Sequence, residues 1–330
     1  MMFCPASAIA AQSPEGEEFD AGELIMHHLV DSYEWHFADH LTLYLPVIVY
    51  SPDLGIKVFS SKVFHDAGAY EGFFLDHGKL RHTDENIRFY DLSITKNVAQ
   101  ILLSLFLMSV IFISMARSYK KRGNQPPKGI AAVFEPIVVY IRDEIAIPNI
   151  GPKYEKFMPY LLTLFFYIWF NNLLGLFPGG GNVTGNLAVT GVLALITFFI
   201  TQFNGNRHYW GHIFNTPGVP WWLKIPLPIM PLVELIGIFT KPFSLMVRLF
   251  ANITAGHIII LSIISLIFIF KTALMSLVSI PFAIFMNFLE LLVALLQAYI
   301  FTLLSAIYFG SAVEEHHEES SQEAMDHATV

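Results

Sequence analysis

The stretch FSLMVRLFANITAGHIIILSIISLIFIF, residues 243–270, decides what kind of fold this chain forms. It is longer than the roughly 20 apolar residues that an α-helix needs to cross a lipid bilayer. Only Arg248 and His257 carry ionisable side chains in it. Arginine stays protonated in proteins, and a charge at bilayer depth costs at least ~2.5–3.5 kcal/mol. Because such a charge normally faces a partner charge or a water-filled cavity, Arg248 marks a candidate functional site.

The composition of the whole chain is that of a membrane protein. Its 330 residues are 54% hydrophobic and only 14% charged, with a mean hydropathy of +0.54, which is too apolar for an ordinary soluble domain. The single cysteine, Cys4, excludes an intramolecular disulfide and a cysteine-rich metal site. The net charge of −8 arises largely in the tails and loops. We expect no metal, no cofactor and no nucleic-acid partner.

The N-terminal residues differ from the rest of the chain. Ala8-Ile9-Ala10 matches the small-residue pattern at which secretory signal peptides are cleaved, although no basic region or full apolar core precedes it. We expect residues 1–11 to be a signal-peptide remnant, with an accidental match as the alternative. Residues 12–93 are polar and predict a separate N-terminal segment of the mature chain.

Two stretches of this segment predict a β-hairpin. Residues 43–50 and 57–64 are rich in strand-forming side chains and flank the turn-like sequence Ser51-Pro52-Asp53-Leu54-Gly55. Nearby, His36 and His40 are spaced to share a helix face. Solvated histidines are the expected interpretation, so we assign no metal site to them.

A run of basic residues predicts the orientation in the membrane. The first long apolar helix is expected at 94–116, and it is followed at once by Arg117, Lys120, Lys121, Arg122 and Lys128. By the positive-inside rule the side that carries this cluster is cytoplasmic, and residues 12–93 are extracytoplasmic. Five crossings then place the acidic tail, residues 314–330, in the cytoplasm.

Long apolar stretches predict an all-α polytopic membrane domain over residues 94–313, with about five membrane-crossing helices. Charged residues interrupt the stretch 129–147, which therefore suits an interfacial helix. The remaining helices are expected at 157–177, 187–204, 228–270 and 273–312. Because the last two exceed the length of one crossing, we expect them to tilt and to pack as an antiparallel hairpin.

The last two helices carry polar side chains that are costly in lipid. Residues 282–313 hold a single charge, Glu290, and the amide Gln297. On the preceding helix Asn252 lies one turn after Arg248, about 40° around the axis. If Gln297 is level with Arg248 in the hairpin, Glu290 falls within about 3 Å axially of His257.

This register predicts two separate polar centres, one around Arg248 and one formed by His257 and Glu290. On an ideal helix His257 points about 180° away from Arg248, so the two serve different surfaces. Imidazole and carboxyl groups exchange protons near neutral pH, whereas arginine lowers the pKa of a nearby acid. The pattern is typical of a proton path beside a fixed charge. Simple hydrogen bonding between helices is the alternative for Glu290 and Gln297.

The stretch ELIGIFTKPFSLMVRLFANITAG, residues 234–256, closely resembles subunit a of the F-type ATP synthase membrane sector. The similarity continues in NNLLGLFPGG at 171–180, in TGN at 184–186 and in LLQAYIFTLLSAIYF at 295–309. It covers roughly residues 94–315, so that the long segment before residue 94 departs from the family's shorter members.

The resemblance implies a multi-pass stator subunit of the bacterial inner membrane that forms two proton half-channels against the rotor c-ring. Its other expected partners are the peripheral stalk subunit b and the remaining ATP synthase subunits. Arg248 would be the stator arginine that faces the rotor carboxylate, with Asn252 and Gln297 beside it. Glu234 would lie on the cytoplasmic side of the proton path, with Ser244 near that route.

The resemblance also implies a role for the second polar centre. His257 and Glu290 fall on positions of the half-channel that opens outside. In some family members these two positions carry the acid and the imidazole in the exchanged order. One acid and one imidazole are retained here, which favours a coupled pair.

Two other classes of protein remain as alternatives. A secondary transporter would use Arg248 to bind an anionic substrate, but the sequence has no evident internal repeat of the kind that such transporters carry. A structural assembly subunit would use the polar residues only to join helices. The sequence contains no GxxxxGK[ST] phosphate-binding loop, so nucleotide chemistry is expected on partner subunits.

Overall fold

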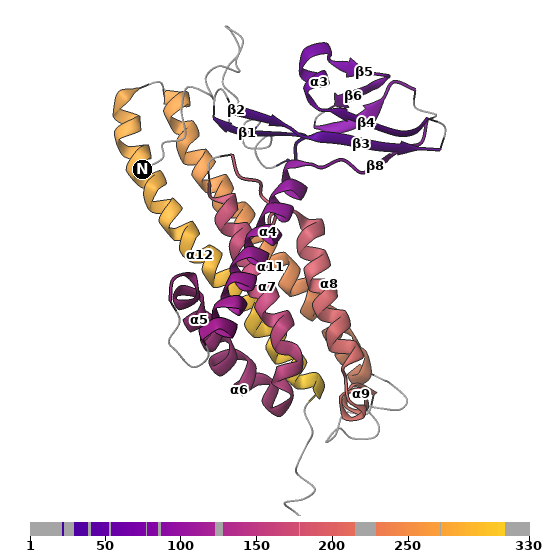
Figure 1. The fold of residues 1–330 in the computed structure, drawn as a ribbon, viewed down its shortest axis with the longest axis vertical. Coiled ribbons are helices and arrows are strands. Elements are labelled where there is room, and N and C mark those ends of the chain that lie inside the picture. The colour runs from indigo at the N-terminus through magenta and orange to yellow at the C-terminus, as the bar shows by residue number, and fades with distance from the viewer. Residues whose placement is uncertain are drawn as a thin grey trace, which may run out of the picture. The chain divides into compact units, whose positions relative to one another are not determined.

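The computed structural model describes residues 22, 30–38, 41–52, 54–76, 78–84, 87–122, 128–177, 179–214, 229–270 and 272–313. Within them the chain forms a β-rich N-terminal part and a set of long helices (Figure 1). The chain divides into two compact units. The first comprises residues 1–113, 167–186 and 250–297, and the second comprises 114–166, 187–249 and 298–330. The expected signal-peptide remnant and acidic tail lie outside the described residues.

Short antiparallel strands and the helix α3 form the N-terminal part. The strands pair in three sheets of order β1-β2, β4-β3-β8 and β5-β6-β7. The bounds of these elements are β1 Glu34–Ala38, β2 Leu41–Tyr44, β3 Pro46–Ser51, β4 Gly55–Ser60, α3 Lys62–Ala67, β5 Ala69–Tyr70, β6 Phe73–Asp76, β7 Lys79–His82 and β8 Tyr90–Asp91.

The predicted hairpin forms between β3 and β4, with Ser51 opposite Gly55 at the turn. Its second strand is shorter than expected, because the chain enters α3 at Lys62 where the prediction continued the strand to residue 64. A short apolar run fits either a strand or a buried helix, and local periodicity does not separate the two. Tertiary packing selects the helix here, because Phe64 is buried when residues 62–67 form α3.

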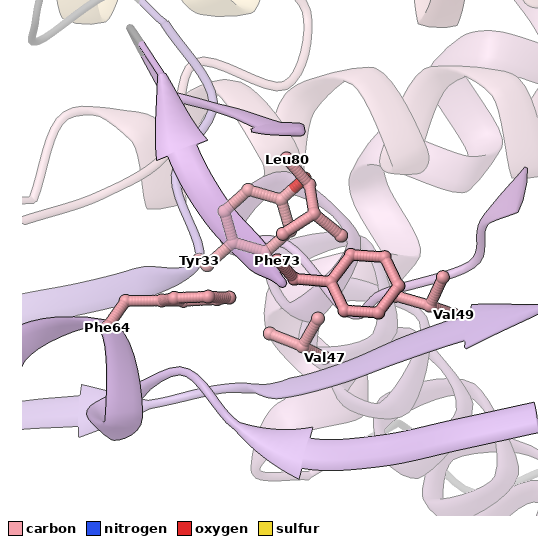
Figure 2. Packing of buried hydrophobic residues seen from close by; sticks show 6 residues of the cluster. All are labelled: Tyr33, Val47, Val49, Phe64, Phe73 and Leu80. Atoms are coloured by element: carbon pink, nitrogen blue, oxygen red, sulfur yellow. The ribbon is translucent and has the colours of Figure 1, made fainter. Parts of the chain in front are cut away.

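A small hydrophobic core holds the N-terminal part together, and Figure 2 shows its side chains converging. Its buried members are Tyr33, Val47, Val49, Phe64, Phe73 and Leu80. The Phe73 ring is 1% exposed, and its centroid lies 5.5 Å from that of Phe89. Tyr33 donates a hydrogen bond to Asp91 Oδ2. Burial raises the pKa of the Tyr33 hydroxyl above its ordinary value, and the hydrogen bond to Asp91 raises this pKa further.

Replacing Phe73 with alanine is expected to destabilise the N-terminal part by about 3–5 kcal/mol, because the ring leaves a cavity in a core with few other members. The measurement is the urea concentration at which a protease cleaves this part of the detergent-solubilised full chain. Leu54→Ala, at a position that is 38% exposed, is the control and should leave the midpoint nearly unchanged. Equal midpoints for the two variants would contradict the assignment of Phe73 to a core.

The long helices are α4 Lys96–Arg122, α5 Ile130–Tyr140, α7 Tyr154–Gly175, α8 Leu187–Phe203, α11 Ile229–Phe270 and α12 Ala273–Val313, with the shorter α6 Ile147–Ile150 and α9 Arg207–Phe214. The helices α8, α11 and α12 begin and end within one residue of the stretches predicted for them, whereas α4 continues to Arg122, six residues past its predicted end. The sequence predicted no helix at α9.

The stretch expected to be one interfacial helix is divided. A π-helical segment, Ile141–Ala146, separates α5 from α6, and a 3₁₀ turn, Gly151–Lys153, follows. Pro148 has no N–H to donate to the carbonyl of Glu144, so a regular α-helix cannot continue through it unchanged. The charged Arg142 and Asp143 pair through a 2.7 Å hydrogen bond on the exposed side of the π-helical segment.

Three of the described helices are long and apolar enough to cross a membrane: Lys96–Lys121, Leu232–Phe270 and Leu274–Val313. The helix α8 is apolar but shorter. The all-α polytopic class predicted for the membrane domain is confirmed, whereas the number of five crossings stays a prediction. The chain reverses between α11 and α12, where Met275 donates its N–H to the Thr272 carbonyl at 3.0 Å.

Candidate functional site

His257 of α11 and Glu290 of α12 lie together in the first unit. Nδ1 of His257 is 3.7 Å from Oε1 of Glu290, and the Glu290 side chain is only 4% exposed. Neither carboxylate oxygen of Glu290 accepts a hydrogen bond from the residues that the structure describes. A buried acid beside an imidazole can pass a proton between the two groups or to water.

Two glycines shape the space around this pair. A Cβ atom on Gly256 would lie 2.8 Å from Oε1 of Glu290, closer than real Cβ atoms approach an oxygen. A Cβ atom on Gly175, the last residue of α7, would lie 3.9 Å from Nε2 of His257, which is an ordinary contact. The absence of a side chain at Gly256 therefore lets the Glu290 carboxylate lie against α11.

Adding one methyl group at Gly256 is expected to displace the Glu290 carboxylate from His257. If the pair conducts protons, Gly256→Ala should lower ATP-driven proton pumping by the assembled complex by about tenfold, within the range that a misplaced proton-transfer group costs. Gly237→Ala is a matched control on the same helix, because a Cβ atom there meets no heavy atom of the described residues within 4 Å. Equal pumping by both variants would show that the carboxylate position is not critical.

An amide of α7 is fixed against the helix that carries Glu290. Asn172 donates through Nδ2 to the carbonyl of Ala294 at 3.2 Å and accepts from Oγ1 of Thr184 at 2.5 Å. Ala294 follows Glu290 by one helical turn. Both Asn172 and Thr184 are buried, so this contact places polar atoms inside the same unit as the His257–Glu290 pair.

A second buried amide joins α4 to the glycine-rich segment after α7. Gln100 donates to the carbonyl of Asn171 at 3.1 Å and accepts from the N–H of Gly181 at 2.5 Å. A Cβ atom on Gly181 would lie 2.7 Å from Oδ1 of Asn97, so this close approach requires glycine. The sequence reasoning missed Gln100, although a lone amide within the apolar run VAQILL was its signal.

Arg248 lies half-buried on α11, within the second unit. Among the described residues it forms no ion pair with an acidic side chain. Its guanidinium is near enough to the Tyr308 hydroxyl of α12 for a direct electrostatic interaction. Nζ of Lys241 lies 5.4 Å from the centre of the same Tyr308 ring. The positive charge of Arg248 is thus open to an acid from outside the described part of the chain.

A narrow crevice in the second unit connects Tyr308 with α9. Its polar lining residues are Thr197, Thr201, Gln202, Tyr209, Lys241 and Tyr308. Gln202 donates to the Tyr209 hydroxyl at 3.2 Å. Burial raises the pKa of Tyr209 above its ordinary value; the Gln202 bond opposes this rise and the Glu234 charge adds to it. Glu234 thus acts electrostatically on one end of the crevice, a connection that sequence spacing did not indicate.

The remaining predicted site residues take different environments. Asn252 and Ser244 are exposed on α11, Glu234 is half-buried on the same helix, and Gln297 is 4% exposed on α12. Asn252 and Gln297 belong to the first unit and Arg248 to the second. The predicted cluster of Arg248 with these two amides therefore stays a prediction.

Long apolar helices that carry Glu290, His257 and Arg248 define a polytopic α-helical membrane protein with ionisable groups within its apolar helices. The membrane domain also matches a known family. A family model described as ATP synthase A chain matches residues 98–310. The chain belongs to the ATP synthase subunit a family.

Individual relatives are similar in sequence to this chain over most of their length. ATP synthase subunit a 2 of Chlorobaculum tepidum is 43% identical over 314 residues, covering 93% of this chain and 77% of the relative. ATP synthase subunit a of Chloroherpeton thalassium is 46% identical over 246 residues, 72% of each chain. ATP synthase subunit a of an Anaeromyxobacter species is 36% identical over 330 residues, 96% of this chain and 76% of the relative. A second family model, described as a domain of unknown function, matches residues 24–101.

Proposed function

We propose that this chain is the stator subunit that forms two proton half-channels against the rotor c-ring and couples proton flow to rotation. One observation carries the proposal: Arg248 is a permanent charge in an apolar helix and has no acidic partner among the described residues. Such a charge is stable at bilayer depth only when water or an opposite charge meets it. A carboxylate on a rotor subunit supplies that opposite charge.

Protons enter through the half-channel that contains His257 and Glu290, which lie 3.7 Å apart. They reach a rotor carboxylate and neutralise it, so that the acid can pass through lipid at low cost. When the acid arrives at Arg248 after rotation, the guanidinium favours its ionised form and drives the proton off. The same positive charge repels protons and prevents direct leakage between the two half-channels.

The released proton leaves through the crevice that begins at Tyr308 and ends near Tyr209 and Glu234. The crevice supports this assignment because hydroxyl, amide and ammonium groups line it within otherwise apolar helices. Such groups form hydrogen bonds with one another and with water, and protons move along hydrogen-bonded paths. Ser244 and Asn252, which are exposed on α11, would tune the surface that faces the rotor. Gln297 stays a predicted residue of the proton path, although its side chain is buried.

Each proton that moves through ~100 mV of membrane potential yields about 2.3 kcal/mol, so rotation must pool several protons for one ATP. Nucleotide chemistry takes place on partner subunits. The partners are the c-ring, the peripheral stalk subunit b and the remaining ATP synthase subunits. The complex resides in the bacterial inner membrane, with the N-terminal part of this chain outside and its C-terminus in the cytoplasm.

The test compares ion flux in vesicles that hold the complete complex with flux in vesicles that hold this chain alone. A stator requires ATP-driven proton pumping by the complete complex and no substrate-dependent uptake by the isolated chain. A secondary transporter predicts the reverse, namely uptake of an anion by the isolated chain. Uptake of that kind would reject the stator assignment.

A further inference from the structure

One face of the β4-β3-β8 sheet is apolar and uncovered by the described residues. The register places Ile48 opposite Val58, Tyr50 opposite Ile56, and Tyr50 opposite Tyr90. Since side chains alternate between the faces of a sheet, these residues share one side, and Leu92 continues it. We call Ile48, Tyr50, Ile56, Val58, Tyr90 and Leu92 the outer face. Ile56, Val58, Tyr90 and Leu92 are 62–70% exposed.

The outer face carries no charge, because the charged side chains of these strands point the other way. Lys57 and Asp91 both lie opposite Val49, a core residue. Lys57 forms an ion pair with Glu71 at 2.8 Å, and Asp91 accepts a hydrogen bond from the core residue Tyr33. The helix α3 and the strands β5 and β6 cover that opposite face (Figure 1).

This pattern is inverted relative to a sheet that faces water. An antiparallel sheet with one face on a core normally presents polar side chains on the other. A contiguous apolar patch of this kind marks a contact surface for a protein or a membrane. The two tyrosine rings stack at 6.4 Å between centroids on this face, and tyrosine is enriched at membrane–water interfaces.

The chain leads from the outer face directly into α4, a helix long and apolar enough to cross a membrane. After β8, Leu92 donates its N–H to Ile48 and Ile94 donates to Pro46, so the pairing with β3 continues almost to the start of α4. Leu92 precedes α4 by a few residues, which places it within about 15 Å of the first turn of a membrane-crossing helix.

Further hydrogen bonds join the stretch around β1, in the same N-terminal part, to the helices of the first unit. The N–H of Lys96 donates to the Ser32 carbonyl at 2.8 Å, and the N–H of Asn97 donates to Oδ1 of Asp31 at 3.0 Å. Trp35 donates through Nε1 to the carbonyl of Gly179 at 2.8 Å, in the segment that follows α7. The N-terminal part is thus fastened to the ends of two helices of the same unit and is not free to move away on a linker.

We propose that the outer face rests on the lipid headgroup interface beside α4. Lipid is favoured over a protein partner because the outer face leads through a short stretch of chain into α4, whose apolar residues Val98, Leu102 and Phe106 are 39%, 53% and 64% exposed. The contact anchors the N-terminal part as an interfacial element in the way that an amphipathic helix lies on a membrane. It is independent of the ion path and goes beyond the proposed stator function.

The test uses the full chain with Cys4→Ser in nanodiscs whose lipids are brominated near the headgroup end of the acyl chain. A fluorophore on Val58→Cys or on Ile56→Cys should be quenched at least about twofold more than one on Asp66→Cys, because only the outer face is at headgroup level. Asp66 lies on α3, on the opposite side of the sheet, and its side chain is 59% exposed. Both outer-face positions are exposed, so the substitutions do not disturb the core.

Two results would overturn the proposal. Equal quenching at the outer face and at Asp66 would show that lipid does not meet this face. Shielding of the Val58 label from aqueous iodide only in the assembled complex, with no lipid quenching of the lone chain, would assign the face to a protein partner instead.

Discussion

Arg248→Lys should abolish ATP-driven proton pumping and ATP synthesis in vesicles that hold the assembled complex, with a loss of about 100-fold or more in each rate. Lysine keeps the positive charge but loses the planar guanidinium, and it gives up its proton when it is buried. A lysine at this position no longer guarantees a permanent charge opposite the rotor acid. The subunit should still be incorporated, because the side chain is only half-buried and the change preserves most of its volume.

Arg142→Lys is the matched control. It makes the same chemical change at a side chain that is 45% exposed and already pairs with Asp143. Its pumping and its incorporation should remain near those of the unchanged complex. Near-normal pumping by the Arg248→Lys complex, with the subunit present in full amount, would reduce Arg248 to a structural charge and remove the central element of the stator mechanism.

Substitutions in the buried pair of His257 and Glu290 should have the second large effect on proton flux. Glu290→Gln alone should lower proton flux at least about tenfold, because an amide cannot take up or release a proton at neutral pH. His257→Glu alone should also lower it, since it sets two acids side by side and raises the pKa of one of them. The double variant His257→Glu with Glu290→His restores one acid and one imidazole, and it should recover most of the lost flux.

Recovery of proton flux in the double variant distinguishes a pair that works together from two residues that act independently. Residues that act independently give additive losses, whereas residues that exchange protons show a large coupling in a double-mutant cycle. Leu292→Ala, on α12 at a position that is 63% exposed, controls for a general weakening of the helix. A double variant that loses as much as the two single variants combined would argue against a coupled pair. Proton flux and subunit content are measured on the same vesicles.

The bounds of α8, α11 and α12 were predictable because helix formation and membrane crossing depend on local properties. The predicted stretch 187–204 became α8, Leu187–Phe203, and the stretch 273–312 became α12, Ala273–Val313. Backbone hydrogen bonds of a helix close within one segment, so an uninterrupted apolar run specifies one. The division of 129–147 by a π-helical segment was missed, because such a bulge depends on how the surrounding turns pack.

In the N-terminal part, most elements were not predictable from the sequence. The hairpin of β3 and β4 was predicted from its turn residues, but α3 and the strands β5 to β7 were not. Their pairing depends on a shared core in which Tyr33 and Leu80 come from distant parts of the chain. Short strands carry little sequence signal of their own, and burial of one face selects the pairing.

The sequence by itself determined the membrane class, the helices and the ionisable residues on them, since charge and apolar length are properties of each segment alone. It also indicated, through helix geometry, that His257 and Glu290 lie at similar depth. Only the tertiary structure decided that their side chains approach to 3.7 Å and that Gly256 leaves room for the carboxylate. The same holds for the bonds of Gln100 to Asn171 and Gly181. The physical reason is that a side-chain contact depends on the rotation and spacing of two packed helices, which no single segment specifies.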